Sequence, residues 1–170
     1  MTYSVGSKVI YPAHGIAEIV AKTTRTINGE EIDYLELVVP ERGFGTSGDM
    51  TVLVPEAKAA ELGVRDAISV EEADEVLAVL AVANVRVPTN WSRRFKNHQE
   101  KLKSGDVYEC AEVVRNLTRR EQSGALSTAE KSMHARARHI LVSELSVSWG
   151  IDPEAAEARI DSVLAPATAP

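Results

Sequence analysis

The chain has 170 residues, 44% hydrophobic and 26% charged, which is typical of a folded protein with one domain or two small ones. It contains no apolar run of about 18 residues and no apolar segment behind a basic start, so we expect neither a membrane span nor a signal peptide. The single cysteine, Cys110, excludes an internal disulfide and fits a reducing, cytoplasmic location.

The net charge of −6 argues at first against nucleic-acid binding, but the charges are unevenly distributed. Residues 86–138 contain 12 Lys or Arg and 6 Asp or Glu, a local charge of +6. The segments 1–63, 64–85 and 139–170 each carry −4. Polyanion binding depends on the local patch, so residues 86–138 are a candidate nucleic-acid interface. A solvated helical surface of mixed charge is the alternative that charge alone leaves open.

The first 62 residues or so are predicted to form short β-strands. Asn28-Gly29 is the strongest two-residue hairpin signal, because both central residues of a type I′ turn need positive φ. β-Branched residues are frequent before this turn, and polar and apolar residues alternate after it. Strands in so short a segment indicate a small, bent barrel of the SH3 or Tudor kind, whose open edges suit protein contacts. The predicted strands cover residues 7–11, 16–27, 31–38 and 50–54.

From about residue 64 the apolar residues recur with a helical period. Two capping boxes, Ser69 to Glu72 and Ser127 to Glu130, each predict a helix start, and Asp106 and Asp152-Pro153 predict two more. Another helix is expected at residues 90–103. We therefore expect an α+β protein: an SH3/Tudor-like β-barrel followed by a compact helical bundle of about five helices. The two domains are predicted at residues 1–63 and 64–170, joined near Gly63.

Two other sequence patterns, a glycine-rich motif and the set of histidines with Cys110, give little support for a ligand-binding or catalytic site. Gly43-Phe-Gly45-Thr-Ser-Gly48 matches G-x-G-x-x-G, but a dinucleotide site needs a helix after this motif and here a strand follows. We interpret the segment as a hairpin loop. No histidine pair has zinc-helix spacing with a general base, and Cys110 lies on an apolar helical stripe. We expect no catalytic site, no metal or other cofactor, and no small-molecule substrate. The histidines are His14, His98, His134 and His139.

Trp91 lies at the first turn of a predicted helix and is followed closely by Arg93, Arg94 and Lys96. These cations can reach phosphates, and the amides of a helix N-terminus also favour anions. An apolar wedge flanked by cations is what minor-groove intercalators use. In the alternative interpretation, Trp91 packs against the preceding linker as a hydrophobic staple and the arginines are solvated.

A second group of cations flanks a helix-turn-helix-like turn at residues 122–127. Such a turn can present a reading helix to the major groove, but few base-reading side chains lie near the start of the helix that follows. Phosphate contact is therefore the preferred interpretation. Three other classes stay open: a sequence-specific helix-turn-helix regulator acting without polymerase, a protein-interaction scaffold, and an enzyme. The cations are Arg119, Arg120, Lys131, Arg136 and Arg138.

Three segments resemble the CarD/CdnL family in the same order along the chain. Val5-Gly-Ser-Lys-Val-Ile-Tyr-Pro-Ala-His-Gly15 is similar to the family's opening, which the transcription-repair coupling factor shares. Residues 88–96 and 124–131 are similar to its C-terminal motifs. The tryptophan motif in residues 88–96 distinguishes the stand-alone regulators from the repair factor.

The resemblance implies a non-enzymatic transcription regulator with two partners. A Tudor-like N-terminal domain docks on the β subunit of RNA polymerase. The resemblance also implies a helical C-terminal domain that places Trp91 in the minor groove of promoter DNA, at the upstream edge of the melted −10 region, and so stabilises the open complex. The expected DNA-binding residues are Trp91, Asn90, Arg93, Arg94, Lys96, Arg120 and Lys131.

The expected polymerase contacts are Arg25, Arg42 and Leu53. Leu53 is a departure from the family pattern, because relatives tend to carry arginine at this place, just before the Val-Pro that ends the last barrel strand. The loop before it, residues 40–49, is longer than in those relatives. Arg42, within this loop, is the candidate substitute for the missing arginine.

Overall fold

The structure, a computed structural model, divides into two compact units, Met1–Ala67 and Ile68–Pro170. The division falls after Gly63 because Val64 is buried in the core of the first unit and Arg65 exchanges backbone hydrogen bonds with Ile10. The structure describes residues 3–12, 14–41, 48–83 and 85–166.

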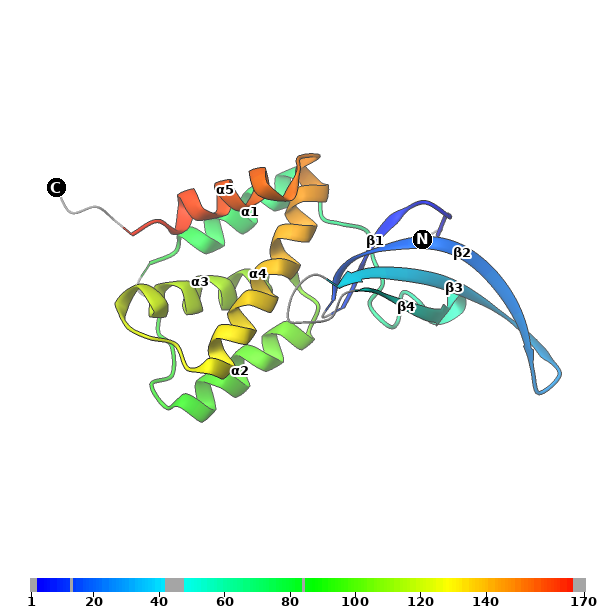
Figure 1. The fold of residues 1–170 in the computed structure, drawn as a ribbon, viewed down its shortest axis with the longest axis horizontal. Coiled ribbons are helices and arrows are strands. Elements are labelled where there is room, and N and C mark those ends of the chain that lie inside the picture. Colours follow the sequence, from blue (N-terminus) through cyan, green and yellow to red (C-terminus); the bar gives the residue numbers. More distant parts are fainter. Residues whose placement is uncertain (1–2, 13, 42–47, 84, 167–170) are drawn as a thin grey trace. The chain divides into compact units, whose positions relative to one another are not determined.

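The first unit is a curled antiparallel sheet that forms half of a small barrel, which confirms the predicted Tudor-like β domain (Figure 1). Its strands follow one another in space in the order β1-β2-β3-β4. The register of β2 on β3 shifts between Ile19 and Ala21, a bulge that bends the strand. The elements are β1 (Lys8–Tyr11), β2 (Gly15–Ile27), β3 (Glu30–Glu41), β4 (Gly48–Pro55) and the short 3₁₀ turn η1 (Glu56–Lys58).

The turn between β2 and β3 has the predicted geometry, with φ of 51° at Asn28 and 80° at Gly29. Beyond the part covered by β1 and β4, the two strands pair only with each other, and Figure 1 shows them as a two-stranded ribbon. Arg25 lies in this ribbon opposite Ile32, with its side chain exposed. The hairpin therefore presents Arg25 away from the core of the sheet.

The second unit contains five α-helices within the described residues, as the periodicity predicts. Each helix begins beside a polar residue whose side chain accepts a backbone hydrogen bond from the first turn. These N-caps are Ser69, Asn90, Asp106, Ser127 and Asp152. The helices are α1 (Val70–Ala81), α2 (Trp91–Lys103), α3 (Val107–Ser123), α4 (Thr128–Trp149) and α5 (Pro153–Leu164).

α3 and α4 form the centre of the helical unit, with α1 and α5 side by side at one end and α2 against α3 (Figure 1). The apolar stripe of α3 faces this core, and Cys110 is buried there with its thiol donating to the carbonyl of Ala137. Cys110 is therefore a core side chain, as predicted, and its burial raises the pKa of the thiol to about 12. None of the described helices is both long and apolar enough to cross a membrane.

His98 is buried between α2 and α3, with 1% of its surface exposed. Its Nε2 lies 3.3 Å from Nδ2 of Asn116, an amide that only donates, so the ring is neutral and accepts at this nitrogen. Nδ1 has no partner among the described residues. Burial, with a further contribution from Lys101, lowers the pKa of His98 to about 4.

This pKa predicts that the free energy of unfolding falls as the pH drops from 6.5 to 4. Across this window the unfolded chain binds a proton at His98 and the folded chain does not, so protonation favours unfolding. The loss should reach on the order of 3 kcal/mol. Urea denaturation at several pH values measures it, and His98→Gln should flatten the curve. An unchanged pH slope in the variant would contradict this assignment.

Candidate nucleic-acid interface

The first turn of α2 presents an exposed tryptophan. Asn90 caps the helix, its side chain accepting from the backbone N–H of Arg93 at 3.0 Å. Trp91, the first helical residue, is 43% exposed. Its ring stacks on Phe95, one turn later, with centroids 5.0 Å apart and planes 9° from parallel. Phe95 therefore supports one face of the indole while much of the ring stays open to solvent.

The polar edge of the same indole is held by α4. Nε1 of Trp91 donates to Oγ of Ser127 and to Oε1 of Glu130, both at 3.1 Å. Stacking and these hydrogen bonds restrain the ring from two directions. The first turns of α2 and α4, far apart in the sequence, thus lie together at this point.

Arg94 differs from its predicted role as a phosphate contact. It is 1% exposed, and Nε donates to Oε2 of Glu130 at 3.0 Å. Its Nη1 donates to the backbone carbonyls of Pro88 and Thr89, at 3.3 and 3.2 Å. A guanidinium enclosed in this way does not reach a phosphate, and the prediction that it does is wrong. Arg94 lies on the side of α2 that faces α4.

Glu130 connects these groups. The capping-box pattern predicts that its carboxylate bonds back to the N-cap backbone, but it lies instead against Arg94, Trp91 and the hydroxyl of Ser127. Burial alone would raise the pKa of this carboxyl, but the hydrogen bond and positive charge of Arg94 outweigh it and lower the pKa. The carboxylate is thus ionised and paired, as a buried charge must be.

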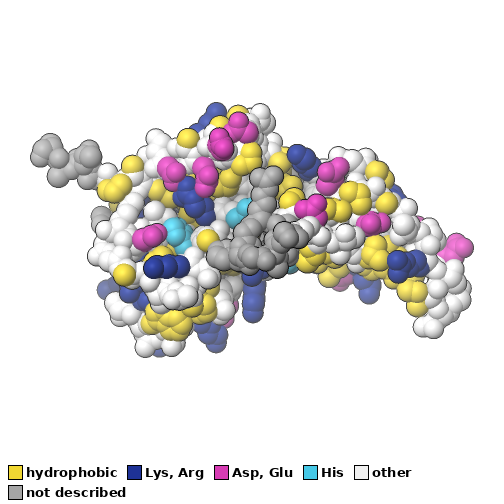
Figure 2. Space-filling model, in the orientation of Figure 1, with side chains coloured by type: hydrophobic (Ala, Val, Ile, Leu, Met, Phe, Trp, Pro, Cys, Tyr) yellow, Lys and Arg dark blue, Asp and Glu magenta, His cyan; other side chains and the backbone are white. Residues whose placement is uncertain are grey.

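Several exposed cations lie near this buried pair in the sequence or in space. Arg93 and Lys96 on α2 and Lys131 on α4 are exposed. Within the described part of the chain, none of the three pairs with a carboxylate. The side chain of Arg120 on α3 is 45% exposed, with Nε 4.0 Å from Oε2 of Glu130. Figure 2 shows basic side chains mainly over the α2 to α4 part of this unit and acidic ones mainly toward α1 and α5.

The predicted polymerase contacts lie on the first unit. Arg25 is exposed on the β2–β3 ribbon. Leu53 lies on β4 opposite Glu36 and is 37% exposed, so its side chain points away from the core. Arg42 and most of the G-x-G-x-x-G segment fall outside the described residues. β4 begins at Gly48, so a strand follows that motif, as predicted. The described residues contain no cluster of His, Cys, Asp and Glu fit to hold a metal ion.

The sequence alone does not predict that Glu130 and Ser127 accept hydrogen bonds from the indole of Trp91. The only local signal is the capping box, which assigns Glu130 to its own helix. Its partners Arg94 and Trp91 lie 36 and 39 residues away, and no spacing rule connects positions that distant.

The fold and this surface define a two-unit protein whose helical unit offers an exposed aromatic ring among cations. The family model for the CarD C-terminal domain matches residues 75–161, and that for the CarD-like/TRCF RID domain matches residues 3–68. The chain is also 28% identical over 149 residues to the "Putative transcription factor YdeB" of Bacillus subtilis (strain 168), covering 88% of this chain and 94% of that protein. The chain belongs to the CarD-like family of transcription regulators.

Removing the carboxylate at the centre of this site should destabilise the helical unit strongly. Glu130→Ala leaves the buried guanidinium of Arg94 without a counter-charge, and we expect the free energy of unfolding to fall by about 3–5 kcal/mol. Denaturant unfolding followed by circular dichroism measures the loss. Glu112→Ala is the control, because it removes the half-exposed Lys101–Glu112 pair (2.7 Å) and should cost less than about 1 kcal/mol. Equal losses in both variants would show that Glu130 has no special role.

Proposed function

We propose that the protein binds the β subunit of RNA polymerase with its first unit and promoter DNA with its second, and stabilises the open promoter complex. The observation that carries this proposal is Trp91, whose ring is open to solvent while its N–H and one face are held within the domain. Family membership supports the pairing of a polymerase-binding unit with a DNA-binding unit.

Trp91 acts as a wedge at the upstream edge of the melted region. A ring already fixed in position loses little conformational freedom when it stacks on a base, so more of the stacking energy remains for binding. Apolar wedges at partly unstacked steps are a known mode of minor-groove binding. A straight, fully stacked duplex offers no such slot, so the wedge favours the distorted state over the closed one.

The exposed cations around the wedge supply the sequence-independent part of DNA binding. Arg93, Lys96 and Lys131 contact backbone phosphates. Asn90, the N-cap of α2, and Arg120, whose Nε lies 4.0 Å from Oε2 of Glu130, are the other proposed contacts. Phosphate contacts fix orientation and carry no base sequence. The acidic total charge of the protein does not oppose this, because the local patch determines binding to a polyanion.

The first unit holds the protein on polymerase. Arg25 on the β2–β3 ribbon and Leu53 on β4 are exposed side chains available to a protein partner. Two weak contacts with one complex reinforce each other, because the first raises the effective concentration for the second. No bond is made or broken in this function: each ~1.4 kcal/mol of preference for the open state shifts the open-to-closed ratio tenfold.

The wedge predicts that Trp91→Ala shortens the lifetime of the open complex about tenfold or more. Stacking of one aromatic ring on a base contributes about 1–3 kcal/mol, and 1.4 kcal/mol corresponds to a factor of ten. Trp91→Phe should keep part of the effect. Competitor-challenge assays on a promoter with polymerase measure the lifetime, and affinity for a straight duplex should hardly change in either variant. An unchanged lifetime in a folded Trp91→Ala protein would leave the cations as the sole DNA contact.

The phosphate contacts predict DNA binding that weakens as salt rises, with a log–log slope of roughly 0.9 per contact. Lys131→Ala and Arg93→Ala should each reduce that slope by about one contact. Lys103→Ala, at the far end of α2, is the matched control and should not change it. Fluorescence anisotropy with labelled duplexes gives the slopes. A strong preference for one duplex sequence would favour the helix-turn-helix alternative.

The polymerase contact predicts that Arg25→Glu weakens capture of the β subunit and leaves DNA affinity unchanged, because the reversed charge lies in the first unit. Pull-down with immobilised β subunit measures the capture. Lys58→Glu, an exposed cation of the same unit on η1, is the control for charge reversal alone. Equal loss in both variants, or none in Arg25→Glu, would remove Arg25 from the polymerase contacts.

A further inference from the structure

The two faces of the Trp91 ring differ in what they contact. One face lies against the ring of Phe95, with centroids 5.0 Å apart and planes 9° from parallel. Phe95 is itself partly buried against the core of the helical unit, so the covered face of Trp91 is directed toward the domain. The exposed surface of Trp91, 43% of the residue, therefore belongs mainly to the opposite face and the free edge of the ring.

Two hydrogen bonds keep the ring from exchanging its faces. Nε1 of Trp91 donates to Oγ of Ser127 and to Oε1 of Glu130, both at 3.1 Å. A half-turn of the ring about its bond to Cβ would move Nε1 away from both acceptors. Glu130 is 1% exposed, so its carboxylate would lose this donor in a place where water does not replace it. The structure therefore determines which face of the indole is open.

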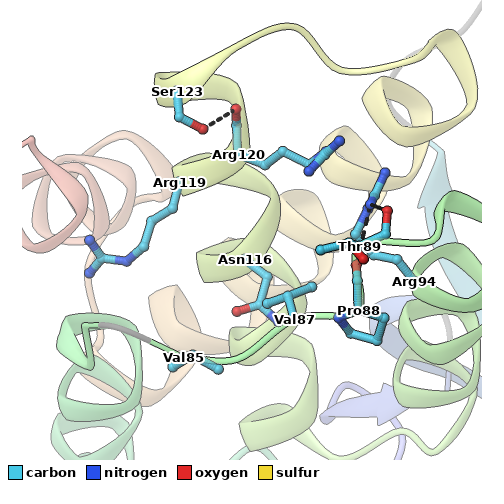
Figure 3. A pocket seen from close by; sticks show the side chains of 9 residues that line it. All are labelled: Val85, Val87, Pro88, Thr89, Arg94, Asn116, Arg119, Arg120 and Ser123. Carbon is cyan, nitrogen blue, oxygen red and sulfur yellow. Dashed lines mark hydrogen bonds between the residues drawn. The ribbon is translucent and has the colours of Figure 1, made fainter.

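The backbone that carries Trp91 is restrained as well. Arg94 lies three residues after Trp91 and donates to the carbonyls of Pro88 and Thr89, before it, at 3.3 and 3.2 Å. Figure 3 shows the guanidinium of Arg94 beside these two residues. Because both the backbone and the ring are held, the open face of Trp91 has one orientation in the domain.

We infer that Trp91 binds DNA through one face only, and that Phe95 is the positioning residue that sets this face. The inference rests on the DNA binding proposed above. The ligand is the exposed face of a single base, as at a junction where a duplex continues into unpaired strands. A side chain inserted between two bases stacks on both of its faces, and the face of Trp91 that lies against Phe95 is not open for this.

The thickness of the Trp91–Phe95 pair leads to the same conclusion. Successive base pairs of B-DNA are about 3.4 Å apart, so a gap left by one missing base pair holds a single aromatic layer. Two parallel rings with centroids 5.0 Å apart form two layers. The pair does not fit this gap, whereas the end of a base stack at a junction is open on one side.

The accessibility of the Trp91 ring in the free, full-length protein tests the positioning role without DNA. In a Trp149→Phe background Trp91 is the sole tryptophan, so acrylamide quenching of the fluorescence measures its open surface. Phe95→Leu should raise the quenching constant about twofold, because the stacked face opens. Phe95→Tyr keeps a ring at this place and should leave the constant unchanged.

Leu102→Ala is the matched control for this measurement. Leu102 lies near the other end of α2 and is partly buried against the same core, so its loss tests general loosening of the helix. We expect no change in quenching. An equal rise in Leu102→Ala and Phe95→Leu, or no rise in either, would overturn the positioning role of Phe95.

Two DNA probes test the single-face contact with Phe95 in place, so this test does not depend on how Phe95 variants fold. One probe is a fork junction, a duplex that continues as two unpaired strands. The other is a continuous duplex with two opposed abasic sites, whose gap offers a base face on each side. Fluorescence anisotropy should give about fivefold tighter binding to the fork, and Trp91→Ala should remove the difference. Phe95→Leu should weaken fork binding about threefold only where Trp91 is present.

Equal or tighter binding to the gapped duplex, lost in Trp91→Ala, would overturn the single-face contact, because it requires both faces of the ring. Weakening by Phe95→Leu that persists in the Trp91→Ala background would show that Phe95 does not act through the ring. Fork binding that does not depend on Trp91 would instead contradict the proposed function. The two failures are therefore distinguishable, and the quenching measurement stands apart from both.

Discussion

The buried ion pair between Arg94 and Glu130 is the interaction on which the helical unit's surface depends. Two charges removed from water are tolerated only when they are paired and their remaining hydrogen-bonding groups are satisfied. Here Arg94 also bonds to Pro88 O and Thr89 O, so the pair joins the start of α2, the linker before it and the start of α4. This junction therefore positions the side chains that bond to the pair.

One carboxylate performs two tasks at this junction. Oε2 of Glu130 bonds to Arg94, while Oε1 bonds to the indole N–H of Trp91. The pair thus stabilises the domain and also orients the one large aromatic side chain left open at the start of α2. A tryptophan held at its polar edge and supported by Phe95 presents a rigid apolar surface, which is what insertion into distorted DNA requires.

The sequence predicts the elements well because their signals are local. Asn28-Gly29 specifies its hairpin through φ, and Ser69, Asp106 and Asp152 specify helix starts through their own first turns. The errors concern distant contacts. Arg94 has the same chemistry as Arg93 but faces α4, so it is buried while its neighbour is exposed. Only the packing of helices separated by about 36 residues decides this difference.

We propose that the exposed ring of Trp91 enters DNA only where base stacking is disrupted. Fluorescence of Trp91 in a Trp149→Phe background tests it most directly, because the chain has two tryptophans. We expect strong quenching on a duplex that contains an unpaired −10 segment, and little change on a fully paired duplex of the same sequence at saturating concentration. Equal quenching on both duplexes, or none on either, would contradict the account.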